Sequence, residues 1–187
     1  MKRIIIALIL LSLTICLPAC SEKENPEFAI FNEMFEESFE TYKISINSTS
    51  ASGHTVNNEY MITTLNGERK VSYKIEKLNE FIVDGDLIEI PESYVTIEQG
   101  TYDAERSASS DFDIPKFNFS VKCLSNPSIS QNKLSADITS LSDFMGIDVD
   151  AKTASCTVSY SGAYVNSIEI SYVTAENVTV VITYTIY

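Results

Sequence analysis

The chain has 187 residues, with 13 Lys and Arg against 26 Asp and Glu, one His, four Cys and no Trp. Its formal net charge of −13 repels phosphate backbones, so we expect no nucleic-acid partner. One His cannot supply a two-His metal motif, and the sequence contains no glycine-rich phosphate-binding motif. We therefore expect no bound metal and no cofactor, and no catalytic residue stands out.

The N-terminus has the pattern of an export signal. Lys2 and Arg3 precede an apolar run over residues 4–17, which is too short to span a bilayer comfortably. The run ends in Leu-Pro-Ala-Cys at residues 17–20, which resembles the lipobox of bacterial lipoproteins, where the cysteine becomes the lipidated first residue. The sequence therefore predicts a signal peptide over residues 1–19.

Lipidation at Cys20 would place the protein outside the cytoplasm, anchored by lipid to a bacterial membrane. Residues 20–26 then form a tether so short that the folded part stays close to the bilayer. Negative charge repels anionic head groups, so adhesion comes from the lipid and not from a basic patch. An ordinary secretory signal or an uncleaved anchor is the alternative interpretation.

An amphipathic helix is predicted over residues 27–41. Its aromatic side chains recur at spacings of three and four, and glutamates occupy the opposite face. Such a stripe either packs on a sheet or lines a ligand cavity. In the second case Phe31, Phe35 and Phe39 are the lining residues. The full stripe consists of Phe28, Phe31, Phe35, Phe39 and Tyr42.

After this helix the apolar period changes to two, which is typical of strands with one dry face and one wet face. Asn66-Gly67 separates two such runs and predicts a type I′ hairpin turn. The predicted strands cover residues 42–46, 60–64, 71–75, 80–84, 86–90, 93–99, 115–124, 134–138, 154–160, 168–172 and 178–186.

Two further segments interrupt the strand pattern. Residues 100–113 are predicted to be a polar loop. Residues 140–145 are predicted to form a short helix, with Ser140 as its N-cap and Gly146 ending it.

We therefore predict a single α+β domain over residues 27–187. An N-terminal amphipathic helix packs on a large curved antiparallel sheet of about eleven strands, which forms an open barrel because a sheet this large usually curls. A second, short helix lies near residues 140–145.

This layout resembles the fold of the outer-membrane lipoprotein carrier and of the mycobacterial lipid-binding lipoproteins. The resemblance is carried by residues 28–42, by the Asn66-Gly67 hairpin and by the closing meander over residues 154–187. It implies a curved sheet wrapped around a hydrophobic cavity that accepts acyl chains. The sequence is also similar to small bacterial lipoproteins without an assigned function. No functional residue of these families can be transferred to a position of this chain.

Two cysteines remain after Cys16 leaves with the signal and Cys20 is lipidated. Cys123 and Cys156 both lie on the apolar side of their predicted strands. Outside the cytoplasm they could form a disulfide, whereas buried free thiols are the equally open alternative.

Other groups with potential chemistry have simpler interpretations. His54 lies in a Ser/Gly loop and no nucleophile motif accompanies it. The paired aspartates at 84/86, 111/113 and 148/150 lack the spacing of a calcium loop and occur where turns favour Asp. Neither feature predicts an enzyme.

Two functional interpretations follow. In the first, the chain is a membrane-anchored extracytoplasmic lipoprotein that binds a hydrophobic ligand or lipid between helix and sheet. In the second, it is a non-enzymatic envelope module with a filled core that binds a protein through residues 100–113 or through a sheet edge.

Overall fold

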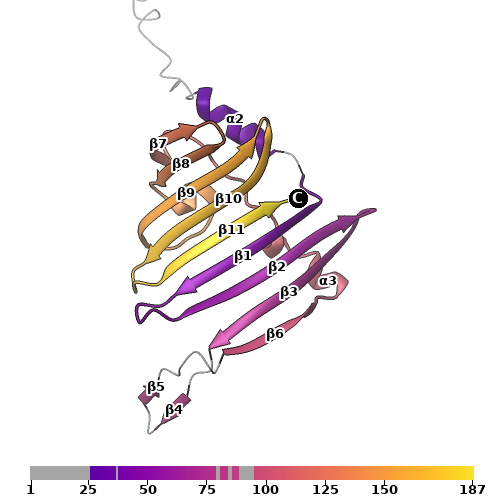
Figure 1. Ribbon diagram of the computed structural model, residues 1–187, viewed down its shortest axis with the longest axis vertical. Coiled ribbons are helices and arrows are strands. Elements are labelled where there is room, and N and C mark those ends of the chain that lie inside the picture. The colour runs from indigo at the N-terminus through magenta and orange to yellow at the C-terminus, as the bar shows by residue number, and fades with distance from the viewer. Residues whose placement is uncertain (1–25, 37, 79–80, 84–85, 89–94) are drawn as a thin grey trace, which may run out of the picture.

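The computed structural model describes residues 26–36, 38–78, 81–83, 86–88 and 95–187. Most of them form one open antiparallel sheet of nine strands (Figure 1), in the order β6-β3-β2-β1-β11-β10-β9-β8-β7. The first and last strands of the sequence, β1 and β11, are neighbours within it. The strands are β1 (Thr41–Thr49), β2 (Thr55–Leu65), β3 (Glu68–Leu78), β6 (Val95–Thr101), β7 (Leu124–Ser130), β8 (Lys133–Ile138), β9 (Ala151–Ser161), β10 (Tyr164–Thr174) and β11 (Thr179–Ile186).

Two short strands, β4 (Phe81–Val83) and β5 (Asp86–Ile88), pair with each other in a separate sheet. A single sheet of about eleven strands is therefore not confirmed. The helices are α2 (Pro26–Met34), α3 (Ala104–Ser107), a 3-10 turn (Ser110–Phe112) and α4 (Leu141–Met145).

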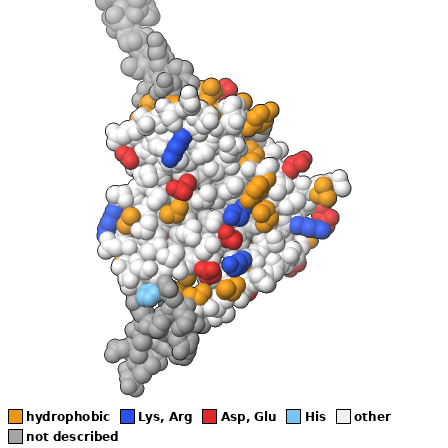
Figure 2. Space-filling view, viewed as in Figure 1, with side chains coloured by type: hydrophobic (Ala, Val, Ile, Leu, Met, Phe, Trp, Pro, Cys, Tyr) orange, Lys and Arg blue, Asp and Glu red, His pale blue; other side chains and the backbone are white. Residues whose placement is uncertain are grey.

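Strand register creates one apolar face. Across five adjacent strands, directly paired residues form a continuous buried row, because paired residues share a face of the sheet. That row is Ile44, Tyr184, Ile168, Val158 and Leu134. The next row, on the opposite face, is Ser45, Thr183, Glu169, Thr157 and Ser135. Figure 2 views this second face, where uncharged polar side chains and backbone predominate.

The predicted hairpin and short helix are confirmed. Asn66 and Gly67 both have positive φ, at 52° and 79°, and Leu65 pairs directly with Glu68 across a two-residue loop. Ser140 caps α4 by accepting a hydrogen bond from the Asp143 N–H at 3.2 Å. Gly146 ends α4 in the left-handed region, with φ of 77°.

The N-terminal helix is shorter than predicted. It ends at Met34 and the chain turns at residues 35–36, whereas the prediction extended it to residue 41. Phe39 and Tyr42 fit the helical spacing by coincidence, since Tyr42 already belongs to β1, where it pairs with Ile62 and Ile186. Ladder hydrogen bonds on both sides of β1 outweigh the helical period at these positions.

A long connection crosses the apolar face of the sheet. It must do so because β6 and β7 lie at opposite edges, so the chain between them has to traverse the whole sheet. Figure 1 shows this connection behind the strands. We call residues 113–123 the crossing segment.

The crossing segment is not a strand, so the strand predicted over residues 115–124 is wrong. Phe117 and Phe119 are buried and alternate with exposed Lys116 and Asn118, which produces the period of two. The N–H groups of Phe119 and Asn118, however, donate to the Asn32 side chain and to a carbonyl of α4 and not to a neighbouring strand. Strand pairing begins where the segment ends, at the Cys123 carbonyl, which accepts from the Thr139 N–H beside β8. Periodicity detected the extended backbone but not the absence of a ladder partner.

Residues 100–113 also differ in part from the predicted polar loop. Gly100 lies on β6, α3 and the 3-10 turn follow, and Phe112 is buried. Phe112 contacts the ring of Tyr60, with the centroids 5.4 Å apart.

Alkaline pH should destabilise the protein through Tyr184. Burial, and then the neighbouring Tyr42 and Tyr172, raise the pKa of this phenol from 10.0 to about 12. The native chain therefore keeps this proton at pH values where the unfolded chain loses it, so the stabilisation is complete below pH 10 and is lost between pH 10 and about 12. We expect Tyr184→Phe to make the fall in unfolding free energy across this window shallower, measured by urea unfolding at several pH values.

Tyr164→Phe is the matched control, because Tyr164 is 73% exposed. It should leave the pH profile unchanged. The Cys156 thiol, whose pKa burial also raises to about 12, contributes equally in every variant. A Tyr184→Phe profile identical to that of the parent chain would contradict the assignment.

Candidate functional site

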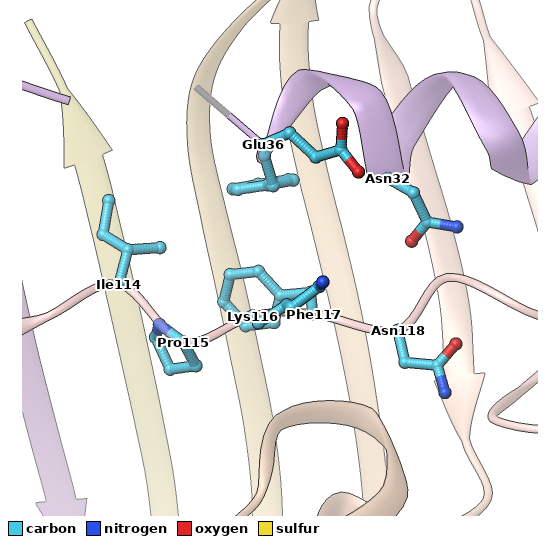
Figure 3. A pocket seen from close by; sticks show the side chains of 8 residues that line it. Asn32, Glu36, Ile114, Pro115, Lys116, Phe117 and Asn118 are labelled. Atoms are coloured by element: carbon cyan, nitrogen blue, oxygen red, sulfur yellow. The ribbon is translucent and has the colours of Figure 1, made fainter. Parts of the chain in front are cut away.

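A hollow lies between the end of α2 and the crossing segment. Its cavity volume is about 870 Å³, and it is open on one side. Figure 3 shows Asn32 projecting from α2 toward the crossing segment below it, and Glu36 lying beside the end of the helix. The lining residues are Asn32, Phe35, Glu36, Ile114, Pro115, Lys116, Phe117 and Asn118.

The side chain of Asn32 fixes the spacing between the two walls of the hollow. Its Nδ2 donates to the Phe119 carbonyl at 3.0 Å, and its Oδ1 accepts from the Phe119 N–H at 2.9 Å. One side-chain amide thus satisfies both backbone groups of a residue that has no strand partner. On the other side, the Asn118 N–H donates to the carbonyl of Phe144 in α4 at 2.9 Å.

Aromatic rings form the floor of the hollow. Phe35 stacks on Phe119, with centroids 5.6 Å apart and planes 18° apart, and meets Phe117 edge-on at 5.0 Å. Phe117 and Phe119 each contact Phe144 at 5.4 Å. Each such pair contributes about 0.5–1.5 kcal/mol beyond area burial, so the ring contacts stabilise the floor.

The rim of the hollow is polar and carries both signs of charge. Glu36 comes from the turn after α2 and Lys116 from the crossing segment, and both are exposed. Ile114 and Pro115 add apolar side chains to the lining. A ring-lined floor beneath a polar rim suits an amphipathic molecule.

The start of the crossing segment is fastened by a second network. The Tyr42 hydroxyl donates to the Phe112 carbonyl at 2.6 Å and accepts from Nη2 of Arg69 at 2.9 Å. Nη1 of Arg69 donates to Asp113 at 2.6 Å. Burial outweighs the nearby Arg69 and raises the pKa of Tyr42.

The three phenylalanines predicted to line a ligand cavity lie in different places. Phe31 is buried between Phe119 and Tyr160, with ring centroids 5.6 and 5.4 Å away. Phe35 lines the main hollow, and Phe39 lines a second, smaller hollow. The structure therefore does not bring the three side chains into one cavity.

Sequence reasoning missed most of the main hollow. Residues 115–117 fall in the predicted strand, Ile114 lies between that strand and the predicted loop, and neither prediction gives these residues a functional role. Pro115 gives no warning, because it is the first residue of the predicted strand, a position that proline tolerates.

The structure contains Cys123 and Cys156 as buried free thiols. Leu124 pairs with Ile138 of β8, and Ala136 of β8 pairs with Cys156, so β8 separates the two cysteines. Two strand spacings amount to about 9.6 Å, beyond the roughly 7 Å between Cα atoms that a disulfide spans. Of the two alternatives, the free thiols fit this arrangement.

Cys20, the predicted signal peptide and residues 20–25 of the predicted tether lie outside the described residues. Asp111 and Asp113 each face an arginine, at 2.7 Å from Arg106 and 2.6 Å from Arg69. Within the described ranges, no cluster of three or more His, Cys, Asp or Glu could hold a metal ion. None of the helices described is long and apolar enough to cross a membrane.

Comparison with known proteins gives no family. No protein-family description matches the chain, and no curated protein matches it. Among solved structures, a redesigned beta barrel is similar over 78% of this chain and 89% of its own, at 10% identity and a TM-score of 0.21. A TM-score this low supports no conclusion about a shared fold or activity.

Replacing Asn32 should separate the walls of the hollow. Asn32→Leu leaves the Phe119 N–H and carbonyl unsatisfied, so we expect a loss of about 1–3 kcal/mol in unfolding free energy. Asn118→Leu is the matched control, because the hydrogen bond at that residue is made by the backbone N–H and survives the change. Urea unfolding measures both variants. Equal losses in the two would show that the Asn32 amide does not hold the segment.

Proposed function

We propose that the protein is a membrane-anchored extracytoplasmic lipoprotein, without catalytic activity, that binds an amphipathic, lipid-like ligand in the hollow between α2 and the crossing segment. Lipidated Cys20 supplies the anchor. The apolar part of the ligand lies on Phe35, Phe117 and Ile114, and its polar part meets the rim.

The observation that carries this proposal is the composition of the hollow. Its volume of about 870 Å³ is within the range of roughly 300–1,000 Å³ that small-molecule sites occupy. The floor offers aromatic rings, while Glu36, Lys116 and the Asn118 amide offer both charge signs and hydrogen-bonding groups at the rim. These exposed rim groups can bind a polar head, which favours an amphipathic ligand over a purely hydrophobic one.

The lipoprotein part of the proposal is supported by the sequence of residues 1–20. The short tether keeps the hollow near the membrane, where amphipathic molecules are abundant. We also propose that the sheet is curved and that the N-terminal helix covers it, as in the lipid-binding lipoproteins that this layout resembles.

Ligand binding is tested with a short-chain fluorescent phospholipid used below its micelle concentration. We expect saturable binding to the full chain, and Ile114→Glu should weaken it at least about tenfold by placing a charge against the acyl chain. Ile97→Glu is the matched control, because Ile97 is 55% exposed on β6 and should not affect binding. Mass spectrometry of protein extracted from its own membranes, without added lipid, identifies any ligand that it carries.

Equal binding by both variants, with no ligand carried from the membrane, would contradict the proposed site. That result would favour the second candidate, a protein-interaction module.

The second candidate is favoured by the filled interior behind the sheet. Phe112, Phe117, Phe119 and Phe144 are all buried there, so side chains cover the apolar face. Among the described strands, β6 lies at one edge of the sheet, the position at which a partner's strand would add. The other edge, β7, is less suited to pairing, because it contains Pro127 and an irregular register between Ser125 and Ser128.

A further inference from the structure

A second apolar surface lies around the C-terminal end of α2. We call it the seat and define it as Ile30, Met34, Phe39, Tyr164 and Tyr187. Ile30 and Met34 are one helical turn apart and share a face of α2. Figure 2 shows hydrophobic side chains gathered at this end of the molecule.

Four members of the seat surround one depression, and Ile30 lies one helical turn before Met34. Met34, Phe39, Tyr164 and Tyr187 line a hollow of about 380 Å³, separate from the main one. Three large apolar side chains of the seat are unusually exposed: Ile30 at 52%, Tyr164 at 73% and Tyr187 at 69%. Single exposed apolar residues are ordinary, but a contiguous group around a depression marks an interaction surface.

The position of the seat identifies its partner. α2 begins at Pro26, six residues after Cys20, and its second turn carries Ile30. Six fully extended residues reach at most about 20 Å. If Cys20 carries acyl chains in a bilayer, the start of α2 is therefore held within reach of that bilayer. The seat surrounds the other end of this nine-residue helix, about 14 Å farther along.

The side chains of the seat also suit a lipid surface. Tyrosine is enriched where hydrocarbon meets head groups, since its ring is apolar and its hydroxyl remains hydrated. Glu40 lies in the same depression, and none of its described lining residues is Lys or Arg. The negative charge disfavours anionic head groups and favours zwitterionic ones.

We propose that the seat rests on the zwitterionic head-group region of the membrane that holds the lipidated N-terminus, with Ile30, Tyr164 and Tyr187 entering the interface. This inference rests on the proposed function, because it requires the lipid anchor. It deepens that function by fixing which end of the molecule faces the bilayer. The hollow between α2 and the crossing segment is then held next to the lipid from which its ligand comes.

The absence of Trp from the chain allows a direct test. Tyr164→Trp places a single fluorescent reporter in the seat, and Ile97→Trp places one on β6, outside the seat. Both positions are exposed, so both substitutions are compatible with folding. The full chain, purified from bacterial membranes, is reconstituted into phosphatidylcholine vesicles whose acyl chains are brominated and quench nearby indole rings.

We expect brominated lipid to quench about half of the indole emission of the Tyr164→Trp variant and little of that of the Ile97→Trp variant, because interfacial side chains lie at the head-group boundary. Vesicles containing phosphatidylglycerol should quench the reporter in the seat less. Mass spectrometry of the peptide that contains Cys20 reports acylation in the same samples.

Three outcomes overturn the seat. Equal quenching of the two variants in acylated, membrane-bound protein contradicts the contact between the seat and the membrane and leaves the lipoprotein proposal intact. A reporter in the Tyr164→Trp variant that is shielded from aqueous iodide, but not quenched by brominated lipid, assigns the surface to a second copy or to another protein. Unmodified Cys20 in protein that stays out of the membrane contradicts both the anchor and the seat.

Discussion

The structure depends on how the apolar face of the nine-stranded sheet is covered. A domain of this size has few helices to offer, and the longest one described, α2, has nine residues. The cover comes instead from the connection between the two sheet edges, because the chain must traverse the face to continue from β6 to β7. The connection therefore has to cross the sheet and also to cover its apolar face. The buried rings of Phe112, Phe117 and Phe119 provide this cover.

An irregular segment in this position has to satisfy its backbone polar groups without a ladder. The Asn32 amide forms hydrogen bonds with the N–H and the carbonyl of Phe119, and the Tyr42 hydroxyl donates a hydrogen bond to the Phe112 carbonyl. These contacts join three parts of the sequence: α2, the first strand and the crossing segment. A helix of nine residues is marginal by itself in water. It is therefore held in place by the Phe31 and Phe35 rings, which pack against Phe119, and by the hydrogen bonds of Asn32. These contacts with Phe119 join the two walls of the main hollow.

Sequence analysis predicted the regular parts of the fold well. The Asn66-Gly67 hairpin, the α4 caps and the alternation in β9, β10 and β11 are local signals, and local backbone preference decides them. The end of α2 was misplaced, because the period of Phe39 and Tyr42 fits both a helix and the start of β1. The crossing segment was mistaken for a strand, because the Phe117/Phe119 alternation reports an extended backbone with one buried side and not its hydrogen-bond partners.

The candidate site was less predictable than the fold. Among the three predicted lining residues, only Phe35 contributes to the main hollow. Its other wall comes from residues nearly 80 positions later, and no local pattern indicates that they meet α2. The pairing of Asn32 with Phe119 is long-range in sequence and specific in geometry, so it emerges only from the assembled chain.

In the function that we propose, the two walls and the polar rim hold a ligand beside a membrane, and this requires the crossing segment to be firmly held. Native-state hydrogen exchange of the Phe119 amide tests this most directly. The account predicts that this N–H exchanges only through near-global unfolding, as amides of the central strands do. Exchange as fast as that of the exposed Asn66-Gly67 turn would show that the segment opens freely, and would contradict the account.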